Sequence, residues 1–235
     1  MSQILITGGA GKLGSALINI MDNALCGTRD NFDFTNASVI NEFLDKHNEV
    51  HAIIHCGALV SPPKVNEKVD EAIQTNIIGT AILSSICFQR NIKLIYISTD
   101  YVFSGNTGNY SETDELLPQN KYAWSKLGGE AAVHMLDNFV IIRLSFGPDL
   151  FPYKAAFVDQ FTSREPASKI AEKIKKIANS DFKGVIHIGA DRKSVYEYAL
   201  GLGATEVDQI SIKDMTVKMP VDTSLNTSLY KSKFD

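Results

Sequence analysis

The chain opens with a short apolar run that passes directly into a glycine-rich turn. Residues 4–6 read Ile-Leu-Ile, residues 7–14 read Thr-Gly-Gly-Ala-Gly-Lys-Leu-Gly, and helical apolar spacing follows. Glycines at this spacing let the backbone turn sharply and approach a phosphate closely. The N–H groups at the start of the next helix favour the phosphate charge. We therefore predict a strand, a dinucleotide-binding loop and a helix, with cofactor contacts at Gly8, Gly11, Lys12, Leu13 and Gly14.

Short apolar runs alternate with helical patterns along the rest of the chain. We expect strands at residues 24–27, 52–56, 94–97, 140–142 and 185–188, and helices at 13–21, 38–44, 72–88, 122–135 and 168–178. Continuous apolar strands between helices indicate a parallel sheet that is covered on both faces. We predict an α/β fold with a Rossmann-type doubly wound sheet. Residues 1–235 form one NAD(P)-binding domain in this prediction, with a small C-terminal substrate lobe drawn mainly from residues 146–168 and 190–235.

Composition narrows the classes of partner. The net charge is −4 and no basic run stands out, which argues against a nucleic-acid partner. No apolar run approaches the roughly 20 residues of a membrane span. Cys26, Cys56 and Cys87 each lie among apolar residues, so we expect buried free thiols in a reducing cytoplasm. The five histidines show no ligand spacing, and no metal site is predicted.

Three side chains form a candidate catalytic centre. The run at 94–97 ends in Ser98 and Thr99, and Tyr122 precedes Lys126 by four residues on a predicted helix. Residues four apart share a helix face. A phenol can protonate the alkoxide left by hydride transfer, and a nearby ammonium lowers the phenol pKa from about 10. We predict that Thr99 orients a carbonyl, Tyr122 donates the proton and Lys126 supports it. The Tyr-Lys spacing alone is common by chance; the glycine loop and the strand-end hydroxyls make it informative.

The choice of cofactor rests on the segment after the second predicted strand. An acidic residue there suits NAD, whereas an arginine suits the 2′-phosphate of NADP. Arg29 comes first after this strand and Asp33 follows. This order favours NADPH, although Arg29 reads equally well as a solvated loop charge. NADH therefore stays open.

Several segments together resemble the dTDP-4-dehydrorhamnose reductases, which are extended short-chain dehydrogenases that modify nucleotide sugars. The matching segments are Asp-Phe-Thr-Asn at 33–36, His-Cys-Gly-Ala at 55–58, Asn76, Ser-Thr-Asp-Tyr-Val-Phe at 98–103, Tyr-x-x-x-Lys-x-x-Gly-Glu at 122–130, Arg-Leu-Ser at 143–145 and Pro-Val-Asp-Thr-Ser-Leu at 220–225. Two features depart from the family pattern. The stretch at 146–158 is short, and the family's Pro-Thr pair reads Arg-Glu-Pro-Ala at 164–167.

The resemblance implies roles for further residues. On the cofactor side these are Asp33, Phe34, Cys56, Gly57, Ala58, Asn76 and Ser98, in addition to Arg29, Tyr122 and Lys126. On the substrate side they are Ser98, Thr99, Asp100, Tyr101, Phe103, Ser145 and Pro220. A homodimer is also implied.

The activity that the resemblance implies is NAD(P)H-dependent reduction of a 4-keto-6-deoxy nucleotide sugar in deoxysugar biosynthesis. Related 4,6-dehydratases carry Thr-Asp-Glu where this chain has Tyr101 after Asp100, which favours reduction over dehydration. Two alternatives stay open. One is a nucleotide-sugar epimerase or a bifunctional epimerase/reductase. The other is a non-catalytic dinucleotide-binding subunit that resembles the regulatory subunit of methionine adenosyltransferase.

Overall fold

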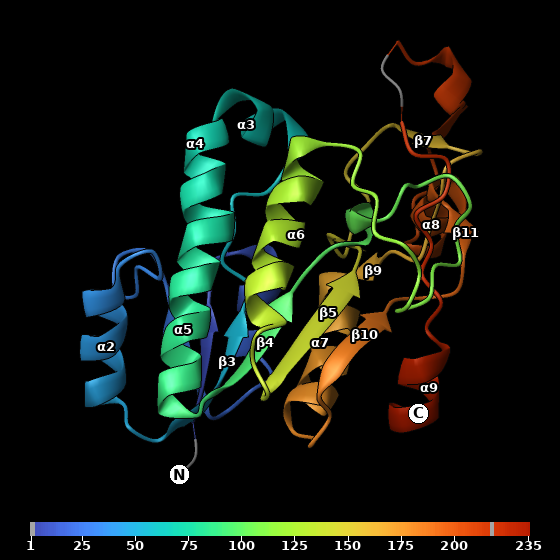
Figure 1. The fold of residues 1–235 in the computed structure, drawn as a ribbon. Helices are drawn as coiled ribbons and strands as arrows, with labels where there is room; N and C mark the ends of the chain where they lie inside the picture. Colours follow the sequence, from blue (N-terminus) through green and yellow to red (C-terminus); the bar gives the residue numbers. More distant parts are fainter. Residues whose placement is uncertain (1–2, 217–218) are drawn as a thin grey trace.

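A six-stranded parallel sheet forms the centre of the computed structural model, which describes residues 3–216 and 219–235 (Figure 1). The strand order is β10-β5-β4-β3-β1-β2, and every neighbouring pair is parallel. The strands span Gln3–Thr7 (β1), Ala24–Gly27 (β2), Val50–His55 (β3), Lys93–Ile97 (β4), Phe139–Leu144 (β5) and Gly184–Ile188 (β10). The predicted Rossmann-type doubly wound sheet is confirmed.

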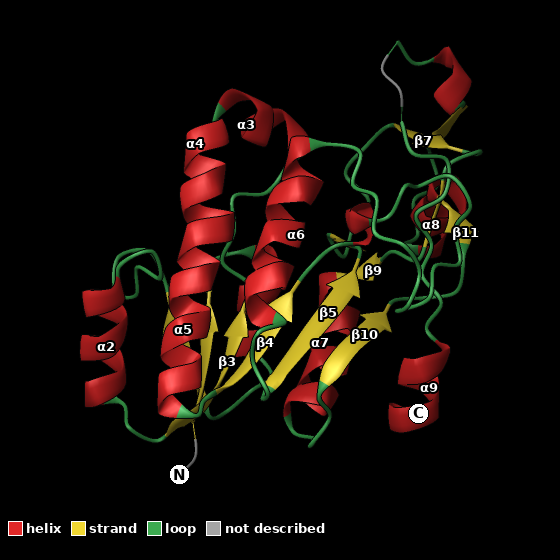
Figure 2. Cartoon of the chain, in the orientation of Figure 1, coloured by secondary structure: helices red, strands yellow, loops and turns green. Residues whose placement is uncertain are grey.

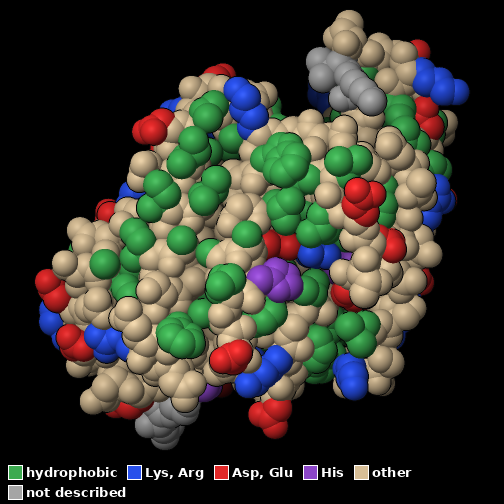
Figure 3. Space-filling view, viewed as in Figure 1, with side chains coloured by type: hydrophobic (Ala, Val, Ile, Leu, Met, Phe, Trp, Pro, Cys, Tyr) green, Lys and Arg blue, Asp and Glu red, His purple; other side chains and the backbone are tan. Residues whose placement is uncertain are grey.

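Helices cover both faces of this sheet (Figure 2). One face packs against α1 and α7, and the other packs against α2, α5 and α6. The helices span Lys12–Ile18 (α1), Ala37–Lys46 (α2), Pro62–Glu67 (α3), Val69–Ala72 (α4), Thr80–Arg90 (α5), Lys121–Val133 (α6) and Ala167–Ala178 (α7). On the outer face of α5 and α6, hydrophobic side chains lie scattered among polar ones (Figure 3), and Phe88 and Trp124 are exposed there.

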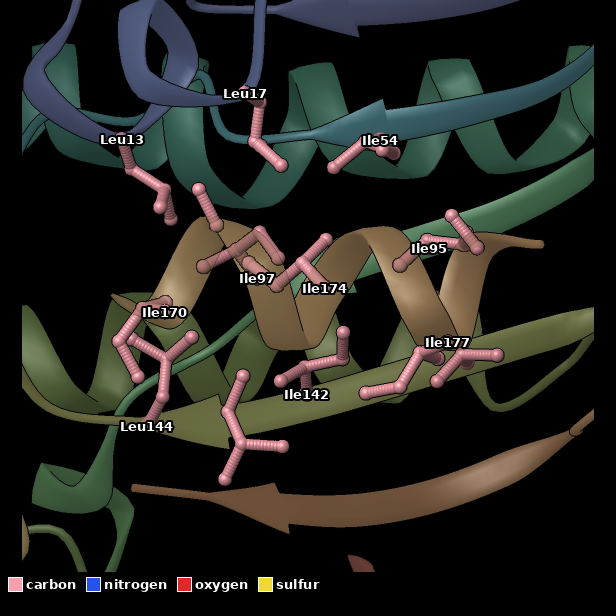
Figure 4. Close-up of a cluster of buried hydrophobic side chains, with 14 of the residues drawn as sticks. Leu13, Leu17, Ile54, Ile95, Ile97, Ile142, Leu144, Ile170, Ile174 and Ile177 are labelled. Carbon is pink, nitrogen blue, oxygen red and sulfur yellow. The ribbon is translucent and has the colours of Figure 1, made fainter. Parts of the chain in front are cut away.

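The two cores follow from the alternation of side chains along each strand. In β4, Ile95 and Ile97 join the core beneath α1 and α7, whereas Leu94 and Tyr96 join the core beneath α2, α5 and α6. Figure 4 shows the first of these cores, where apolar side chains of α1 and α7 meet those of β3, β4 and β5. Continuous apolar strands are required because both sheet faces are buried.

Short strand pairs build a lobe beside the carboxyl edge of the sheet. The pairs are β6 (Phe146–Gly147) with β9 (Glu165–Pro166), β7 (Ala155–Phe157) with β12 (Asp208–Ile210), and β8 (Phe161–Thr162) with β11 (Lys193–Ser194). Helix α8 (Val195–Gly201) packs against β7. The β7–β12 and β8–β11 pairs join the two segments from which we predict the substrate lobe, whereas the β6–β9 pair lies within the first segment. The last helix, α9 (Ser228–Phe234), instead returns to the main sheet, where Tyr230 enters the core.

The helix predicted at 72–88 differs from the expectation in one respect. The structure places α4, a π-helical stretch at Ile73–Gly79 and α5 end to end in this region. The Asn76 carbonyl accepts a hydrogen bond from the Thr80 hydroxyl inside the wide turn. Apolar periodicity indicates which face of a helix is buried but does not distinguish π from α geometry. The sequence therefore could not predict the π-helical stretch.

The prediction of three buried thiols is wrong for one residue. Cys87 is buried and Cys56 is half-buried, but Cys26 is exposed. Cys26 lies on β2, which is one of the two edge strands of the sheet, and an edge strand has less cover than an inner one. Within the two described ranges, no helix has both the length and the hydropathy needed to cross a membrane.

Helix α6 is tied closely to the sheet. The Tyr96 hydroxyl on β4 donates a hydrogen bond of 3.1 Å to the Lys126 carbonyl. A Cβ atom on Gly129 would overlap that same hydroxyl. One residue further on, Glu130 binds Arg143 of β5 at 2.8 Å, with both side chains almost fully buried. The helix therefore has a fixed height above the strands.

We expect Glu130→Gln to lower the free energy of unfolding by about 3–5 kcal/mol, because it leaves the buried Arg143 guanidinium without a counter-charge. Urea denaturation followed by circular dichroism measures the change. Glu172→Gln is the matched control, since Glu172 pairs with Lys169 on the surface and both side chains are exposed. Equal stability of the two variants would contradict the assigned role of the Glu130 ion pair.

Candidate active site

The candidate site lies where the carboxyl ends of β1, β3, β4 and β5 meet. Ligands of open α/β sheets bind at this edge. The glycine loop follows β1, residues 56–58 follow β3, Ser98 and Thr99 follow β4, and Ser145 follows β5. Helix α6 brings Tyr122 and Lys126 to the same edge, so the structure assembles the residues that the sequence analysis predicted on separate segments.

The glycine loop requires glycine at two positions. Gly8 has a φ of +65°, and a Cβ atom there would lie 2.8 Å from the Gly57 amide nitrogen. A Cβ atom on Gly14 would overlap the Gly8 carbonyl. The loop thus leaves backbone room at the start of α1, and these residues fit a dinucleotide pyrophosphate. Gly11 and Lys12 are exposed at this point, whereas Leu13 is buried in the core and can offer only its backbone N–H.

A groove of about 480 Å³ continues from the glycine loop. Its lining includes the predicted cofactor residues Arg29, Asp33, Phe34, Gly57 and Ala58. The Asp33 carboxylate accepts hydrogen bonds from the Thr35 backbone and hydroxyl, at 3.0 and 2.6 Å. Arg29 is exposed and lies 3.6 Å from Glu71 across the groove. The Arg29 guanidinium and the Asp33 carboxylate therefore both line the part of the groove where the adenosine end of a dinucleotide would lie.

Buried polar contacts hold the floor of this groove. The Thr7 hydroxyl accepts a hydrogen bond from the Gly57 amide and contacts the His55 ring at 2.6 Å. Burial lowers the pKa of His55 to about 3, and the Lys126 charge acts in the same direction, so the imidazole is neutral at pH 7. Neutral His55 completes the network by contacting the Thr80 hydroxyl at 3.2 Å.

Asn76 is buried and its amide is fully engaged. Its oxygen accepts from the Leu59 amide, and its nitrogen donates to the Leu59 carbonyl and the Ser125 hydroxyl. These contacts join the loop after β3 to α6. They support a positioning role for Asn76 next to the predicted cofactor residues.

Two of the three predicted catalytic residues, Thr99 and Tyr122, line a second cavity of about 280 Å³, whereas Lys126 does not line it. Its lining includes Ser98, Thr99, Asp100, Tyr101, Tyr122, Ser145 and Arg164. The rings of Tyr101 and Tyr122 meet edge to face, with centroids 6.5 Å apart. The buried Ser98 hydroxyl has no hydrogen-bond partner among the described residues. Buried hydroxyls are normally satisfied, so a polar ligand atom fits at this point of the cavity.

Lys126 is almost fully buried, and its ammonium lies 4.1 Å from the centroid of the Tyr96 ring. Burial lowers the pKa of Lys126 to about 8, although the Glu130 carboxylate opposes that shift. Burial raises the pKa of the Cys56 thiol to about 12, with the Lys126 charge opposing, so the thiol is neutral. Lys126 is therefore the group in this cluster that changes charge closest to neutral pH.

Burial raises the pKa of the Tyr122 phenol, and the Asp100 carboxylate raises it further, while a hydrogen bond with Thr99 opposes the shift. The phenol is therefore protonated at neutral pH, and the predicted lowering of its pKa by Lys126 is wrong, because burial and the Asp100 charge raise that pKa instead. A protonated tyrosine beside a strand-end hydroxyl can donate to a substrate oxygen.

Asp100 is occupied by contacts within the protein. It accepts hydrogen bonds from the Thr223 hydroxyl at 2.7 Å and from the Thr99 hydroxyl at 3.2 Å. Burial raises its pKa, with the Thr223 hydrogen bond and the Arg164 charge among the opposing effects. Asp100 thus anchors the lobe segment that contains Thr223 to the end of β4.

Tyr101 also borders a neighbouring cavity of about 170 Å³, together with the predicted substrate residues Phe103 and Pro220. Phe103 is buried and stacks on Tyr110, with ring centroids 4.5 Å apart. The two cavities share Tyr101. Tyr101 therefore places the two cavities next to each other as candidate substrate surfaces.

The site contains residues to which the sequence analysis assigned no role. They are Ser61, Leu144, Phe146 and Arg164 in the catalytic cavity and Thr223, which binds Asp100. Thr223 falls inside the matching segment at 220–225, which was the available signal for it. No motif in the sequence indicated a role for Arg164, which appeared only as part of the segment at 164–167 that departs from the family's Pro-Thr pair. Among the described residues, no cluster of three or more His, Cys, Asp or Glu side chains could hold a metal ion.

Comparisons with known proteins identify relatives of this chain. The chain is 31% identical over 153 residues to the dTDP-4-dehydrorhamnose reductase of Aggregatibacter actinomycetemcomitans, a match that covers 62% of this chain and 52% of that protein. The chain thus spans about half the length of this curated reductase. It is 27% identical over 241 residues to the methionine adenosyltransferase 2 subunit beta of Rattus norvegicus, covering 85% of this chain and 71% of that protein.

A solved structure shares the fold over nearly the whole chain. The dTDP-4-dehydrorhamnose reductase of Bacillus anthracis, solved in complex with NADP, superposes with a TM-score of 0.89 at 23% identity, covering 99% of this chain and 93% of that one. The family model described as RmlD substrate binding domain matches residues 1–164. This match spans more than half of the chain and confirms the resemblance found in the sequence. The chain belongs to the RmlD substrate-binding domain family.

Proposed function

We propose that this protein is an NAD(P)-dependent oxidoreductase that reduces the keto group of a 4-keto-6-deoxy nucleotide sugar, with Tyr122 as the proton donor. The observation that carries the proposal is the shared cavity of Thr99, Tyr122 and the unpartnered Ser98 hydroxyl, at the sheet edge that also holds the glycine loop. The names of the reductase relatives support the substrate class.

The proposed reaction needs one hydride and one proton at a carbonyl. The residues of the glycine loop and the groove would hold a nicotinamide dinucleotide, which would supply the hydride. The Tyr122 hydroxyl donates a hydrogen bond to the carbonyl oxygen, and the Thr99 hydroxyl donates a second one by turning its proton away from Asp100. Tyr122 then passes its proton to the oxygen that becomes the alcohol, and a proton from solvent restores the phenol. The Lys126 ammonium stabilises the phenolate while it exists.

The contacts of Asp100 support reduction over dehydration. A dehydratase needs carboxyl groups that exchange protons with the sugar, whereas Asp100 is buried and accepts from Thr99 and Thr223. Tyr101 occupies the next position and lies at the junction of the two cavities. Its pKa is raised, chiefly by burial, so it offers a neutral phenol to the sugar.

A second candidate function is a dinucleotide-binding regulatory subunit without turnover. The similarity to the beta subunit of methionine adenosyltransferase 2, which extends over 85% of this chain, favours it. The complete set of Thr99, Tyr122 and Lys126 favours the enzyme instead.

We also propose a homodimer. The proposal rests on the resemblance to the reductase family, and Phe88 on α5 and Trp124 on α6 are exposed apolar side chains that a dimer contact would cover. Sedimentation velocity would test the proposal, and a monomer at micromolar concentration would exclude it.

We expect Tyr122→Phe to lower kcat for keto-sugar reduction by about 10²–10⁴, because the variant keeps the ring and loses the proton. The assay follows the absorbance of NADPH with dTDP-linked and UDP-linked 4-keto sugars. Tyr153→Phe is the matched control, since Tyr153 is 66% exposed and outside both cavities. Undiminished turnover by Tyr122→Phe would exclude the acid role, and absence of turnover in the unmodified protein would favour the regulatory subunit.

The pKa of Lys126 predicts an alkaline loss of activity. The ammonium is present below about pH 8 and is lost as the pH rises through that value, whereas Tyr122 stays protonated. We therefore expect kcat/KM to fall above about pH 8. Lys126→Met should have low activity at every pH and should show no further fall in kcat/KM above about pH 8. The same fall in Lys126→Met would show that another group titrates there.

The position of Arg29 at the groove predicts a preference for NADPH over NADH. We expect Arg29→Ala to weaken NADPH binding about tenfold and to leave NADH binding unchanged, because only NADPH carries the 2′-phosphate. Titration of the cofactor fluorescence measures both affinities. Equal losses for the two cofactors would show that Arg29 does not read the 2′-phosphate.

A further inference from the structure

Arg164 differs from the other four arginines of the chain. Arg29, Arg90, Arg143 and Arg192 each have a carboxylate oxygen within 4.0 Å, from Glu71, Asp45, Glu130 and Asp222 respectively. Arg164 has no carboxylate partner at that distance in the two described ranges of the chain. Its neighbour Glu165 pairs with Lys173 at 2.6 Å and does not compensate it.

The Arg164 side chain is held in place although it lacks a counter-charge. Its Nε donates a hydrogen bond of 3.4 Å to the Ser145 hydroxyl, and its guanidinium lies 6.0 Å from the Tyr198 ring centroid. The backbone amide donates to the Thr162 hydroxyl at 3.1 Å. The two terminal amino groups make no hydrogen bond with any residue that the structure describes. A half-buried cation with unused donors is therefore positioned before any ligand arrives.

Arg164 lines the same cavity as Thr99 and Tyr122. The carboxylate nearest to the reacting groups, Asp100, accepts from two threonine hydroxyls and forms no ion pair with Arg164. A planar guanidinium presents paired N–H groups that match the two oxygens of a carboxylate or a phosphate. The cavity therefore contains both Tyr122, which can donate a proton to a carbonyl, and the unpaired Arg164 guanidinium, which can bind an anion.

We propose that Arg164 is a specificity-determining residue that binds an anionic oxygen group of the substrate. The diphosphate supplies such a group in a 4-keto-6-deoxy nucleotide sugar, whereas a C6 carboxylate supplies it in a nucleotide-linked keto uronic acid, which would then replace the 6-deoxy sugar as the substrate. The inference rests on the proposed function, because it places the keto sugar against Thr99 and Tyr122. Paired with Arg164, the anion orients the sugar so that its carbonyl faces Tyr122.

The test is calorimetric titration of the full chain, saturated with NADPH, with dTDP, UDP-glucose and UDP-glucuronate. The variants are Arg164→Gln, Arg164→Lys and the control Arg90→Gln, which removes an arginine of α5 that lies in neither of the two site cavities. We expect Arg164→Gln to weaken binding of at least one probe about tenfold or more, since it removes charge-assisted hydrogen bonds. Arg164→Lys should restore part of the affinity, and Arg90→Gln should match the unmodified protein.

The three probes distinguish the two sources of the anion. If the diphosphate pairs with Arg164, the variant weakens dTDP and UDP-glucose binding to the same degree. If a ring carboxylate pairs with it, the unmodified protein prefers UDP-glucuronate over UDP-glucose, and Arg164→Gln abolishes that preference. Either pattern supports the proposal.

The proposal is overturned if Arg164→Gln binds all three probes within twofold of the unmodified protein, or if the unmodified protein binds none of them. Cofactor fluorescence must show unchanged NADPH binding, which verifies that the variant is folded. Turnover of keto sugars is measured separately. Binding that depends on Arg164 without any turnover would reject the proposed reaction but support the anion site. Turnover that does not change in the Arg164 variants would support the proposed reaction but reject the anion site.

Discussion

Helix α6 approaches β4 so closely that Gly129 has no room for a side chain beside the Tyr96 hydroxyl, and the buried Glu130–Arg143 ion pair fixes the same turn to β5. Since Lys126 precedes Glu130 by one helical turn and Tyr122 precedes Lys126 by another, this contact sets the height of both side chains at the sheet edge. The candidate catalytic geometry therefore depends on an interaction that lies outside the cavity itself.

Burial at this edge then controls which groups carry charge. It lowers the pKa of Lys126 to about 8 and that of His55 to about 3, and it raises the pKa values of Tyr122 and Asp100. The Tyr122 phenol and the neutral His55 ring are thereby held in their uncharged forms at pH 7. The arrangement suits a site in which Tyr122 donates a proton while Lys126 supplies the charge that stabilises the product phenolate.

The lobe completes the cavity from residues distant in the chain. The Thr223 hydroxyl donates a hydrogen bond to Asp100, which lies 123 residues earlier in the chain. Arg164 donates a hydrogen bond to Ser145, which follows β5. The sheet edge contributes the groups that the proposed reduction needs, and the lobe adds the unpaired guanidinium. In our interpretation, the lobe selects the substrate and the sheet edge carries out the chemistry.

The strands, the glycine loop and the Tyr122–Lys126 pair could be predicted from the sequence, because each depends on local spacing: continuous apolar runs for a sheet buried on both faces, glycines where a Cβ cannot fit, and a four-residue step along a helix. Other features depended on contacts between segments far apart in the chain. Cys26 is exposed because β2 became an edge strand, and the π-helical turn forms where Asn76 binds Leu59 of the loop after β3 and Thr80 contacts His55 at the end of β3. Arg164 became part of the site only when the lobe folded over β5 and left its guanidinium without a carboxylate, since local periodicity carries no information about which distant charges meet.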